Sequence, residues 1–240
     1  MKLDILAIGA HPDDVELGCS GTLAKEIHQG KSVGILDLTR GELGTRGSAE
    51  IRDKESAAAA KILNIKIREN LSFSDGFFIN DKHHQIEIIK IIRKYRPEVV
   101  FCNAVDDRHI DHPKASQLVS ASCFLSGLTK INTKLDGSNT FQEEWRPKFI
   151  YHYLQWKNIS PDICVDISDF MTIKLKAVMA YKSQFFKEGL SEKNTPISTK
   201  NFIDSVEYRA RDLGRLSGVD YAEGFTVERC PLVNSIFDLK

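Results

Sequence analysis

The 240-residue sequence has no excess of either charge and no long apolar run. Lysine plus arginine and aspartate plus glutamate each number 33, so the formal net charge is zero. This balance gives no support for nucleic acid or an anionic membrane as a partner. No apolar stretch approaches the roughly 20 residues of a membrane-spanning helix, and no segment has the pattern of a signal peptide. We therefore expect a protein that works in the cytoplasm without a membrane partner.

The sequence also has few cysteines and no C-x-x-C pair. Its five cysteines are scattered and odd in number, which is typical of reduced thiols in a cytoplasmic protein and argues against a structural zinc knuckle. They are Cys19, Cys102, Cys123, Cys164 and Cys230.

A glycine-rich phosphate loop is missing where an α/β protein often has one. The apolar run Leu3–Ile8 is followed by G-A-H-P-D-D-V-E (9–16), without the G-x-G-x-x-G spacing. Two carboxylates at the start of a helix would repel a phosphate and attract a divalent cation. This turn therefore excludes a nucleotide-dependent dehydrogenase of the Rossmann type.

Apolar strand-like runs alternate with helical patterns through the first half of the chain. The pattern predicts an α/β fold: a Rossmann-like, mostly parallel sheet with helices on both faces and a less regular C-terminal part. We expect one domain over 1–240, with a core at about 1–128 and further strands, a loop and helices at about 129–240. The expected strands are Leu3–Ile8, Ser32–Leu38, Ile67–Phe73, Val99–Asn103, Phe149–Leu154 and Ile163–Ile167, and the last predicted helix leads into Tyr221–Thr226. The expected helices are Val15–His28, Ala49–Leu63, Gln85–Tyr95, Pro113–Gly127, Ser168 to about Tyr181 and Asn201 to about Leu216.

Three polar segments follow predicted strands and should lie on one rim of the sheet, because ligands bind beyond the carboxyl ends of parallel strands. These segments are Gly9–Asp14, Thr39–Gly47 and Ala104–His112. A long segment of low hydrophobicity, Glu188–Lys200, is a candidate for a lid or a disordered loop.

Two clusters on this rim carry groups that bind metals. One contains His11, Asp13 and Asp14, and the other contains His109 and His112. Together they offer the imidazole and carboxylate groups that Zn²⁺ or Fe²⁺ prefers, and a catalytic site would leave one position open for water.

Each cluster taken alone has a simpler interpretation. Asp13 could cap the following helix, with Glu16 completing a capping box, and the second pair could be loop histidines without a role. Capping does not explain His11, nor why both clusters follow strands on the same rim. The joint pattern therefore favours a metal site.

The motifs A-H-P-D-D-V-E and, about 100 residues later, R-H-I-D-H resemble the PIG-L/LmbE-type family of zinc-dependent N-acetylglucosaminide deacetylases. The stretches D-L-T-R-G-E-L-G-T-R-G (37–47), Y-K-S-Q-F (181–185) and S-G-V-D-Y-A-E-G-F (217–225) resemble the bacillithiol branch of that family. The resemblance implies hydrolysis of the acetamide of N-acetylglucosaminyl-malate, a small-molecule substrate, and a possible homo-oligomer.

The resemblance also implies roles for individual residues. His11, Asp14 and His112 would bind the metal, Asp13 would be the general base, and Arg52 would contact the substrate. His109 would, as a cation, stabilise the oxyanion or protonate the leaving amine, with its charge maintained by Asp106 or Asp111. Asp111 could instead orient a ligand histidine.

A malate group brings two carboxylates, so arginines are expected in the pocket. The candidates are Arg46, Arg52 and Arg108, although exposure to solvent is the default for each. The histidines outside the two clusters, His28, His83, His84 and His152, are expected to be structural.

Two other functions fit the same residues. One is deacetylation of another N-acetylglucosamine conjugate or a chitin fragment. The other is a non-catalytic domain that binds a metal or a sugar, which would need neither Asp13 as a base nor His109.

Overall fold

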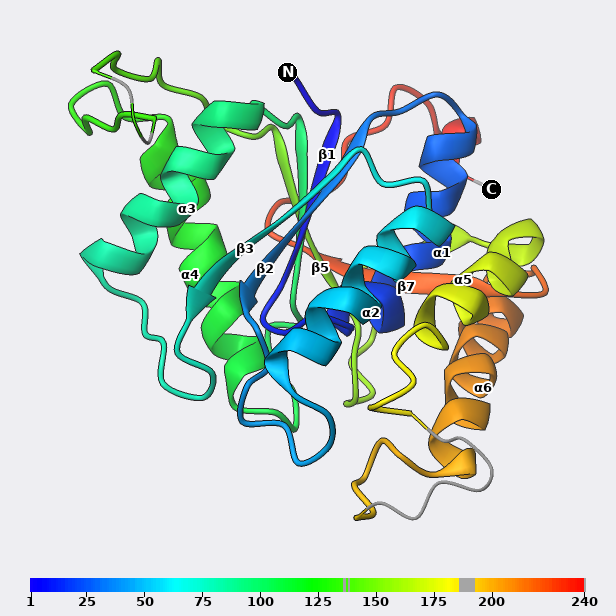
Figure 1. Ribbon diagram of the computed structural model, residues 1–240. Helices are drawn as coiled ribbons and strands as arrows, with labels where there is room; N and C mark the ends of the chain where they lie inside the picture. The colour runs from blue at the N-terminus through cyan, green and yellow to red at the C-terminus, as the bar shows by residue number, and fades with distance from the viewer. Residues whose placement is uncertain (136, 138, 186–192, 240) are drawn as a thin grey trace.

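Seven strands form one sheet in the computed structural model, which describes all residues except 136, 138, 186–192 and 240 (Figure 1). The order across the sheet is β3-β2-β1-β4-β5-β7-β6. The strands are β1 (Ile5–Gly9), β2 (Val33–Thr39), β3 (Ile67–Phe73), β4 (Val99–Cys102), β5 (Phe149–Tyr153), β6 (Ile163–Asp166) and β7 (Ala222–Val227). Strands β1 to β5 pair in parallel, whereas β7 runs antiparallel to both of its neighbours. The prediction of a mostly parallel α/β sheet is confirmed.

Helices cover both faces of this sheet, as predicted. They are α1 (Asp14–His28), α2 (Ala49–Ile62), α3 (Lys82–Tyr95), α4 (Asp111–Ser126), α5 (Met171–Val178) and α6 (Lys200–Ser217), with 3₁₀ turns at Ser168–Phe170 and Ile236–Asp238. Helices α3 and α4 lie on one face, and α1, α2, α5 and α6 lie on the other (Figure 1). No helix in the described part of the chain is long and apolar enough to cross a membrane.

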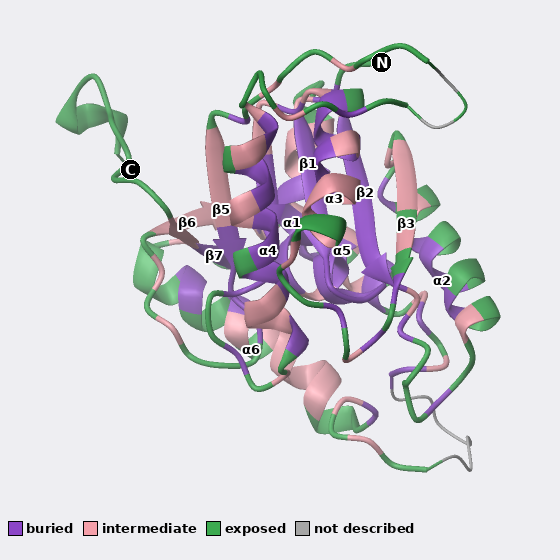
Figure 2. Cartoon of the chain, turned by 90° about the vertical axis from the view of Figure 1, so that its left-hand side faces the viewer, coloured by how far each residue is buried: buried purple, intermediate pink, exposed green. Residues whose placement is uncertain are grey.

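The central strands are apolar on both sides because both sides are covered. Every residue of β1 and β2 is buried, whereas the edge strand β3 is only partly buried (Figure 2). Along β1, Leu6 and Ile8 pack on the α3/α4 side, and Ile5 and Ala7 pack on the α1 side. Successive side chains of a strand point to opposite faces, so one short strand contributes to two cores.

The second half of the chain extends the same sheet. Its strands β5, β6 and β7 add to β4, and the ends of the six predicted strands differ from the observed ends by at most two residues. Strand β7 forms from the segment after the last helix, for which no secondary structure was predicted. The helix expected from Ser168 to about Tyr181 begins as a 3₁₀ turn and ends at Val178. Of the candidate lid Glu188–Lys200, residues 188–192 lie outside the described part of the chain.

The start of α1 differs from the predicted capping box. Asp13 is the N-cap residue, but its side chain makes no capping hydrogen bond, and its backbone is left-handed with φ of 114°. Glu16 is fully buried and accepts hydrogen bonds from Arg68 (2.6 Å) and from the Tyr181 hydroxyl (3.1 Å). The capping interpretation is therefore wrong: Glu16 neutralises a buried arginine, and Asp13 is directed elsewhere.

Strands β1 and β4 are neighbours whose connections leave to opposite faces of the sheet, through α1 and α4 respectively. Such a reversal opens a crevice beyond the carboxyl ends of the two strands, where ligands of open α/β sheets bind. The loops that carry both predicted clusters begin at this point.

Candidate active site

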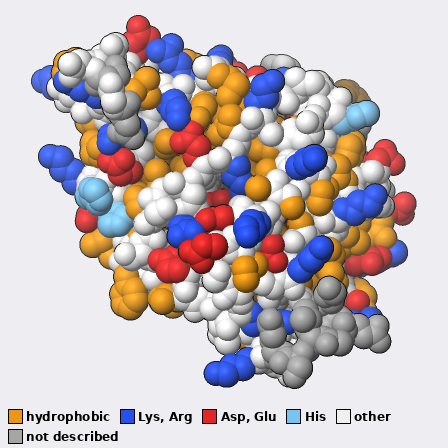
Figure 3. Space-filling model, in the orientation of Figure 1, with side chains coloured by type: hydrophobic (Ala, Val, Ile, Leu, Met, Phe, Trp, Pro, Cys, Tyr) orange, Lys and Arg blue, Asp and Glu red, His pale blue; other side chains and the backbone are white. Residues whose placement is uncertain are grey.

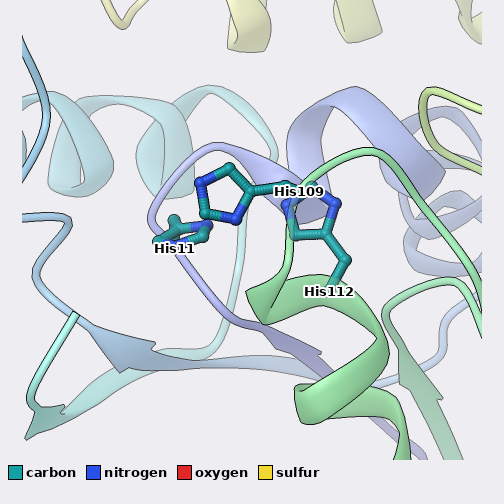
Figure 4. Close-up of side chains that lie close together, drawn as sticks. All are labelled: His11, His109 and His112. Carbon is teal, nitrogen blue, oxygen red and sulfur yellow. The ribbon is translucent and has the colours of Figure 1, made fainter. Parts of the chain in front are cut away.

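Three imidazoles meet in this crevice (Figure 4). His11 comes from the turn after β1, and His109 and His112 come from the start of α4. One ring nitrogen of each lies within 4.8 Å of the other two. The buried carboxylate of Asp14 lies between two of the rings: its Oδ2 is 3.4 Å from Nδ1 of His11, and its Oδ1 is 3.1 Å from Nε2 of His112. The structure therefore brings together all the residues predicted to bind a metal.

Carboxylates lie behind two of these rings. Nε2 of His11 is 3.1 Å from Oδ1 of Asp75 and 3.3 Å from Oδ2 of Asp111. Nδ1 of His112 contacts Asp107. A metal-binding histidine usually donates its second ring N–H to such a partner, which fixes the tautomer and the ring orientation. The arrangement leaves Nδ1 of His11 and Nε2 of His112 facing Asp14.

Two amide side chains hold Asp14 in place. Asn103, after β4, donates to its Oδ2 (3.0 Å), and Gln155, after β5, donates to its Oδ1 (3.1 Å). Asn103 also accepts a hydrogen bond from the backbone of Ala10 (2.9 Å), so it links the loops after β1 and β4. Neither amide could be predicted, because single Asn and Gln residues after strands carry no recognisable motif.

The donor set fits a divalent metal. Zinc bonds to nitrogen and oxygen of about 2.0–2.2 Å place tetrahedral ligand atoms about 3.3–3.5 Å apart. The two contacts of Asp14 with the rings, 3.4 Å and 3.1 Å, are close to this spacing. The cluster of His11 with Asp75 and Asp111 is a less suitable site, because these carboxylates accept hydrogen bonds from the backbones of Leu43 and Gly76.

Asp13 is buried beside this group. Burial, partly opposed by the charge of Arg52, raises the pKa of its carboxyl to about 7. NH2 of Arg52 lies 3.9 Å from Oδ2 of Asp13. A carboxyl with a pKa near neutrality can both accept and return a proton under physiological conditions, which suits a general base.

His109 has a different electrostatic environment from the one expected. Burial and the neighbouring His11 and His112 lower the pKa of its imidazole. Asp111 bonds His11 instead, and the exposed Asp106 pairs with Lys157 at 2.7 Å. The prediction that these carboxylates keep His109 cationic is therefore wrong. Its Nδ1 accepts a hydrogen bond from the backbone N–H of Asp111 (3.3 Å), which places the proton of the neutral ring on Nε2.

The three predicted arginines lie in different places. Arg52 is buried next to Asp13 and donates to Gln184, which also binds the carbonyl of the buried Arg46. Arg108 is exposed, and its guanidinium lies over the ring of Trp156. Arg52 thus contacts Asp13 of the first predicted cluster.

His152, one of the histidines expected to be structural, is a buried residue of β5. It bonds the Ser116 hydroxyl (2.9 Å) and Glu228 (3.1 Å) and lies outside the imidazole group.

Comparisons with known proteins agree with this geometry. Residues 6–123, which include both clusters, match the PIG-L family model, described as GlcNAc-PI de-N-acetylase. The chain is 31% identical over 232 residues to diacetylchitobiose deacetylase of Thermococcus kodakarensis, covering 92% of this chain and 81% of that protein. It is 38% identical to the conserved protein TT1542 of Thermus thermophilus, with a TM-score of 0.85 and 98% of each chain covered.

A more distant relative carries a different name. The chain is 24% identical over 238 residues to 4-oxalmesaconate hydratase of Pseudomonas putida, covering 91% of this chain and 86% of that enzyme. The fold therefore supports more than one reaction, and the higher identity is with the deacetylase. Together with the imidazole and carboxylate group, these findings show that the chain belongs to the PIG-L family and is a metal-dependent N-deacetylase.

Proposed function

We propose that this enzyme removes the acetyl group of an N-acetylglucosamine conjugate, and that the conjugate is N-acetylglucosaminyl-malate of bacillithiol biosynthesis. The observation that carries the reaction is Asp13, a buried carboxyl with a raised pKa beside a group of ligand type. The relative from Thermococcus kodakarensis, named for diacetylchitobiose, supports an acetylated glucosamine as substrate.

The metal would be held by Nδ1 of His11, the carboxylate of Asp14 and Nε2 of His112. Zn²⁺ is the proposed ion, and Fe²⁺ suits the same two-histidine, one-carboxylate set. When bound, the ion supplies Lewis-acid polarisation of the acetyl carbonyl and a lower pKa for the attacking water.

Asp13 moves the proton. It accepts a proton from the water as the oxygen bonds to the acetyl carbon, and it returns this proton to the sugar nitrogen as the C–N bond breaks. Water and amide thus become acetic acid and the free amine, and at neutral pH the proton of the acid passes to the amine to give acetate and the ammonium form. General acid–base catalysis of this kind typically contributes about 10²–10⁴-fold to the rate.

His109 stabilises the negative charge that develops on the acetyl oxygen. Its neutral ring carries the proton on Nε2, so it acts as a hydrogen-bond donor rather than as a cation. A preorganised donor at such an oxyanion is worth about 10²–10³-fold in turnover.

Two of the stretches that resemble the bacillithiol branch meet at Arg52. A Cβ added to Gly41, in the stretch 37–47, would lie 1.7 Å from Nη1 of Arg52, so a larger residue would displace this guanidinium, and the φ of +64° also favours glycine here. Gln184, in the stretch 181–185, accepts its hydrogen bond. These stretches therefore support a role for Arg52 beside Asp13, where it would contact the substrate, and the resemblance supports malate as the aglycone.

An assay of the released amine tests the substrate. We expect N-acetylglucosaminyl-malate to be hydrolysed faster than N-acetylglucosamine or diacetylchitobiose. Equal rates on all three would contradict the malate conjugate, faster turnover of diacetylchitobiose would favour a chitin fragment, and no turnover of any would favour another N-acetylglucosamine conjugate.

We further propose that the enzyme works in the cytoplasm, since its five cysteines are unpaired, as thiols are in a reducing compartment. A homo-oligomer and the single-domain organisation with a core at about 1–128 stay predictions. Light scattering in solution tests the first, and the cooperativity of unfolding tests the second.

A further inference from the structure

A hollow lies next to the imidazole group, on the side of α6. Its volume is about 370 Å³, and its walls come from the loop after β4, the end of β5, the start of α1 and one side of α6. Asp107 and Gln155 line it, and both also contact His112. The hollow therefore adjoins the candidate active site.

One wall of the hollow is a stack of aromatic rings with a cation on top. The guanidinium carbon of Arg108 lies 4.5 Å from the centre of the Trp156 ring. Trp156 stacks on Phe202 of α6 with ring centres 5.8 Å apart, and Phe202 stacks on Phe185 at 5.9 Å. The stack holds Arg108 at the edge of the hollow, and within the described part of the chain its guanidinium donates no side-chain hydrogen bond.

A second arginine reaches the same tryptophan from α6. NH2 of Arg209 donates to the backbone carbonyl of Trp156 at 2.6 Å, and the side chain lines the hollow. A guanidinium has five N–H donors, and only one of them is used by the residues that the structure describes. Burial lowers the pKa of Arg209.

Neither arginine has a carboxylate within ion-pair distance among the residues that the structure describes. The two acidic residues that line the hollow are engaged elsewhere. Asp107 bonds His112 and the backbone of Lys157, and Glu223 bonds Lys174 at 2.6 Å. Two uncompensated guanidinium groups facing one hollow attract an anion, since carboxylates and phosphates accept paired N–H bonds from arginine.

We infer that Arg108 and Arg209, held by the ring and the backbone of Trp156, bind a negatively charged group on the aglycone of the substrate. This inference rests on the proposed function and adds Arg209 as a residue that determines specificity. Two kinds of ligand carry such an anionic group, namely a malate conjugate, through its carboxylates, and a sugar phosphate.

Calorimetric titration of the metal-loaded enzyme with deacetylated sugars tests this without turnover. The probes are glucosaminyl-malate, glucosamine 1-phosphate and methyl glucosaminide. We expect at least one anionic probe to bind more tightly than the neutral one, and the stronger of the two identifies the anion. Arg209→Met, which keeps an apolar side chain of similar length, should weaken that probe about 10- to 100-fold relative to methyl glucosaminide.

Arg211→Met is the matched control. It lies on the same helix, with its guanidinium over Tyr221 and bonded to Glu207, and it does not line the hollow. It should leave the preference for the anionic probe unchanged. Equal binding of all three probes, or equal weakening of all three by Arg209→Met, would overturn the inference.

The two proposals fail differently. Hydrolysis of a neutral N-acetylglucosaminide without any preference for anionic probes would refute the anion site and support the proposed deacetylation. Binding of glucosaminyl-malate that depends on Arg209, without hydrolysis of its acetylated form, would support the anion site and refute the proposed reaction.

Discussion

Nε2 of His11 lies 3.1 Å from Oδ1 of Asp75, a carboxylate from the loop after β3 that no motif in the sequence marks. Two hydrogen bonds hold Asp75 in place. Its Oδ2 accepts one from the backbone N–H of Leu43 (3.0 Å), and its own backbone N–H donates the other to the Glu42 carboxylate (2.8 Å). The pair therefore connects a proposed metal ligand to the loops after β2 and β3, and these loops become part of the site.

The Asp75→Asn variant tests this connection. Loss of the carboxylate makes His11 a weaker ligand, and because Asp111 still bonds the same nitrogen, we expect the affinity for Zn²⁺ to fall by about tenfold. Competition with a chelating dye measures the affinity. Asp106→Asn, on an exposed carboxylate paired with Lys157, is the control and should bind zinc normally. An unchanged affinity in Asp75→Asn would remove Asp75 from the site.

Zinc binding should release protons. In the metal-free protein burial opposes the protonation of both rings, yet the surrounding carboxylates raise the pKa of His112 to about 9 and that of His11 well above its usual value. Both are therefore protonated at pH 7 and must lose a proton to bind the ion. We expect the affinity to rise with pH up to about 9. Calorimetry in buffers of different ionisation enthalpy should show one proton released from each ring, and no release would contradict these two ligands.

The buried Arg68 should be important for stability. It bonds Asp37 (2.7 and 2.8 Å) and Glu16 (2.6 Å), and both carboxylates are almost completely buried. Arg68→Met leaves two buried carboxylates without their cationic partner, and we expect a loss of about 3–5 kcal/mol in the free energy of unfolding. Denaturant titration measures it. Arg40→Met, which breaks an exposed pair with Asp53, should hardly change the midpoint. A similar small change in Arg68→Met would refute the role of this cluster.

Asp13 should lower the thermal stability of the protein. Its φ of 114° strains a residue other than glycine, and its carboxyl is buried. Asp13→Gly removes both penalties, so we expect a higher melting temperature together with lost turnover, the strain being about 1–3 kcal/mol. Calorimetry checks the first and the amine assay checks the second. A lower melting temperature would mean that the turn depends on the Asp13 side chain.

Much of the fold could be predicted because its signals are local. Buried parallel strands are continuous apolar runs, and β1 to β4 alternate with helices whose ends carry capping residues such as Ser48 and Asp81. The Ser48 hydroxyl accepts a hydrogen bond from Ile51, and the Asp81 carboxylate accepts one from His84. The reversal of β7 could not be predicted, because strand direction depends on contacts between distant segments.

The residues of the candidate site also fall into two groups, those with a local sequence signal and those without one. The proximity of His11, Asp14 and His112 could be predicted because their motifs follow strands that end on one rim. Asp75, Gln155 and the second guanidinium, Arg209, have no such marker, since each reaches the site through pairing of distant segments. Glu16 was misread because its partner, Arg68, lies in β3, and its position near a helix start suggested a cap.

The most direct test of the account is the rate of amine release by Asp13→Asn after its zinc content has been matched to that of the wild-type enzyme. The substitution keeps the shape of the side chain and removes its ability to accept a proton, while His11, Asp14 and His112 stay in place. We predict full zinc occupancy and a rate at least about 100-fold lower than that of the wild type. Wild-type turnover in the zinc-loaded variant would contradict the central claim that Asp13 is the general base of this deacetylase.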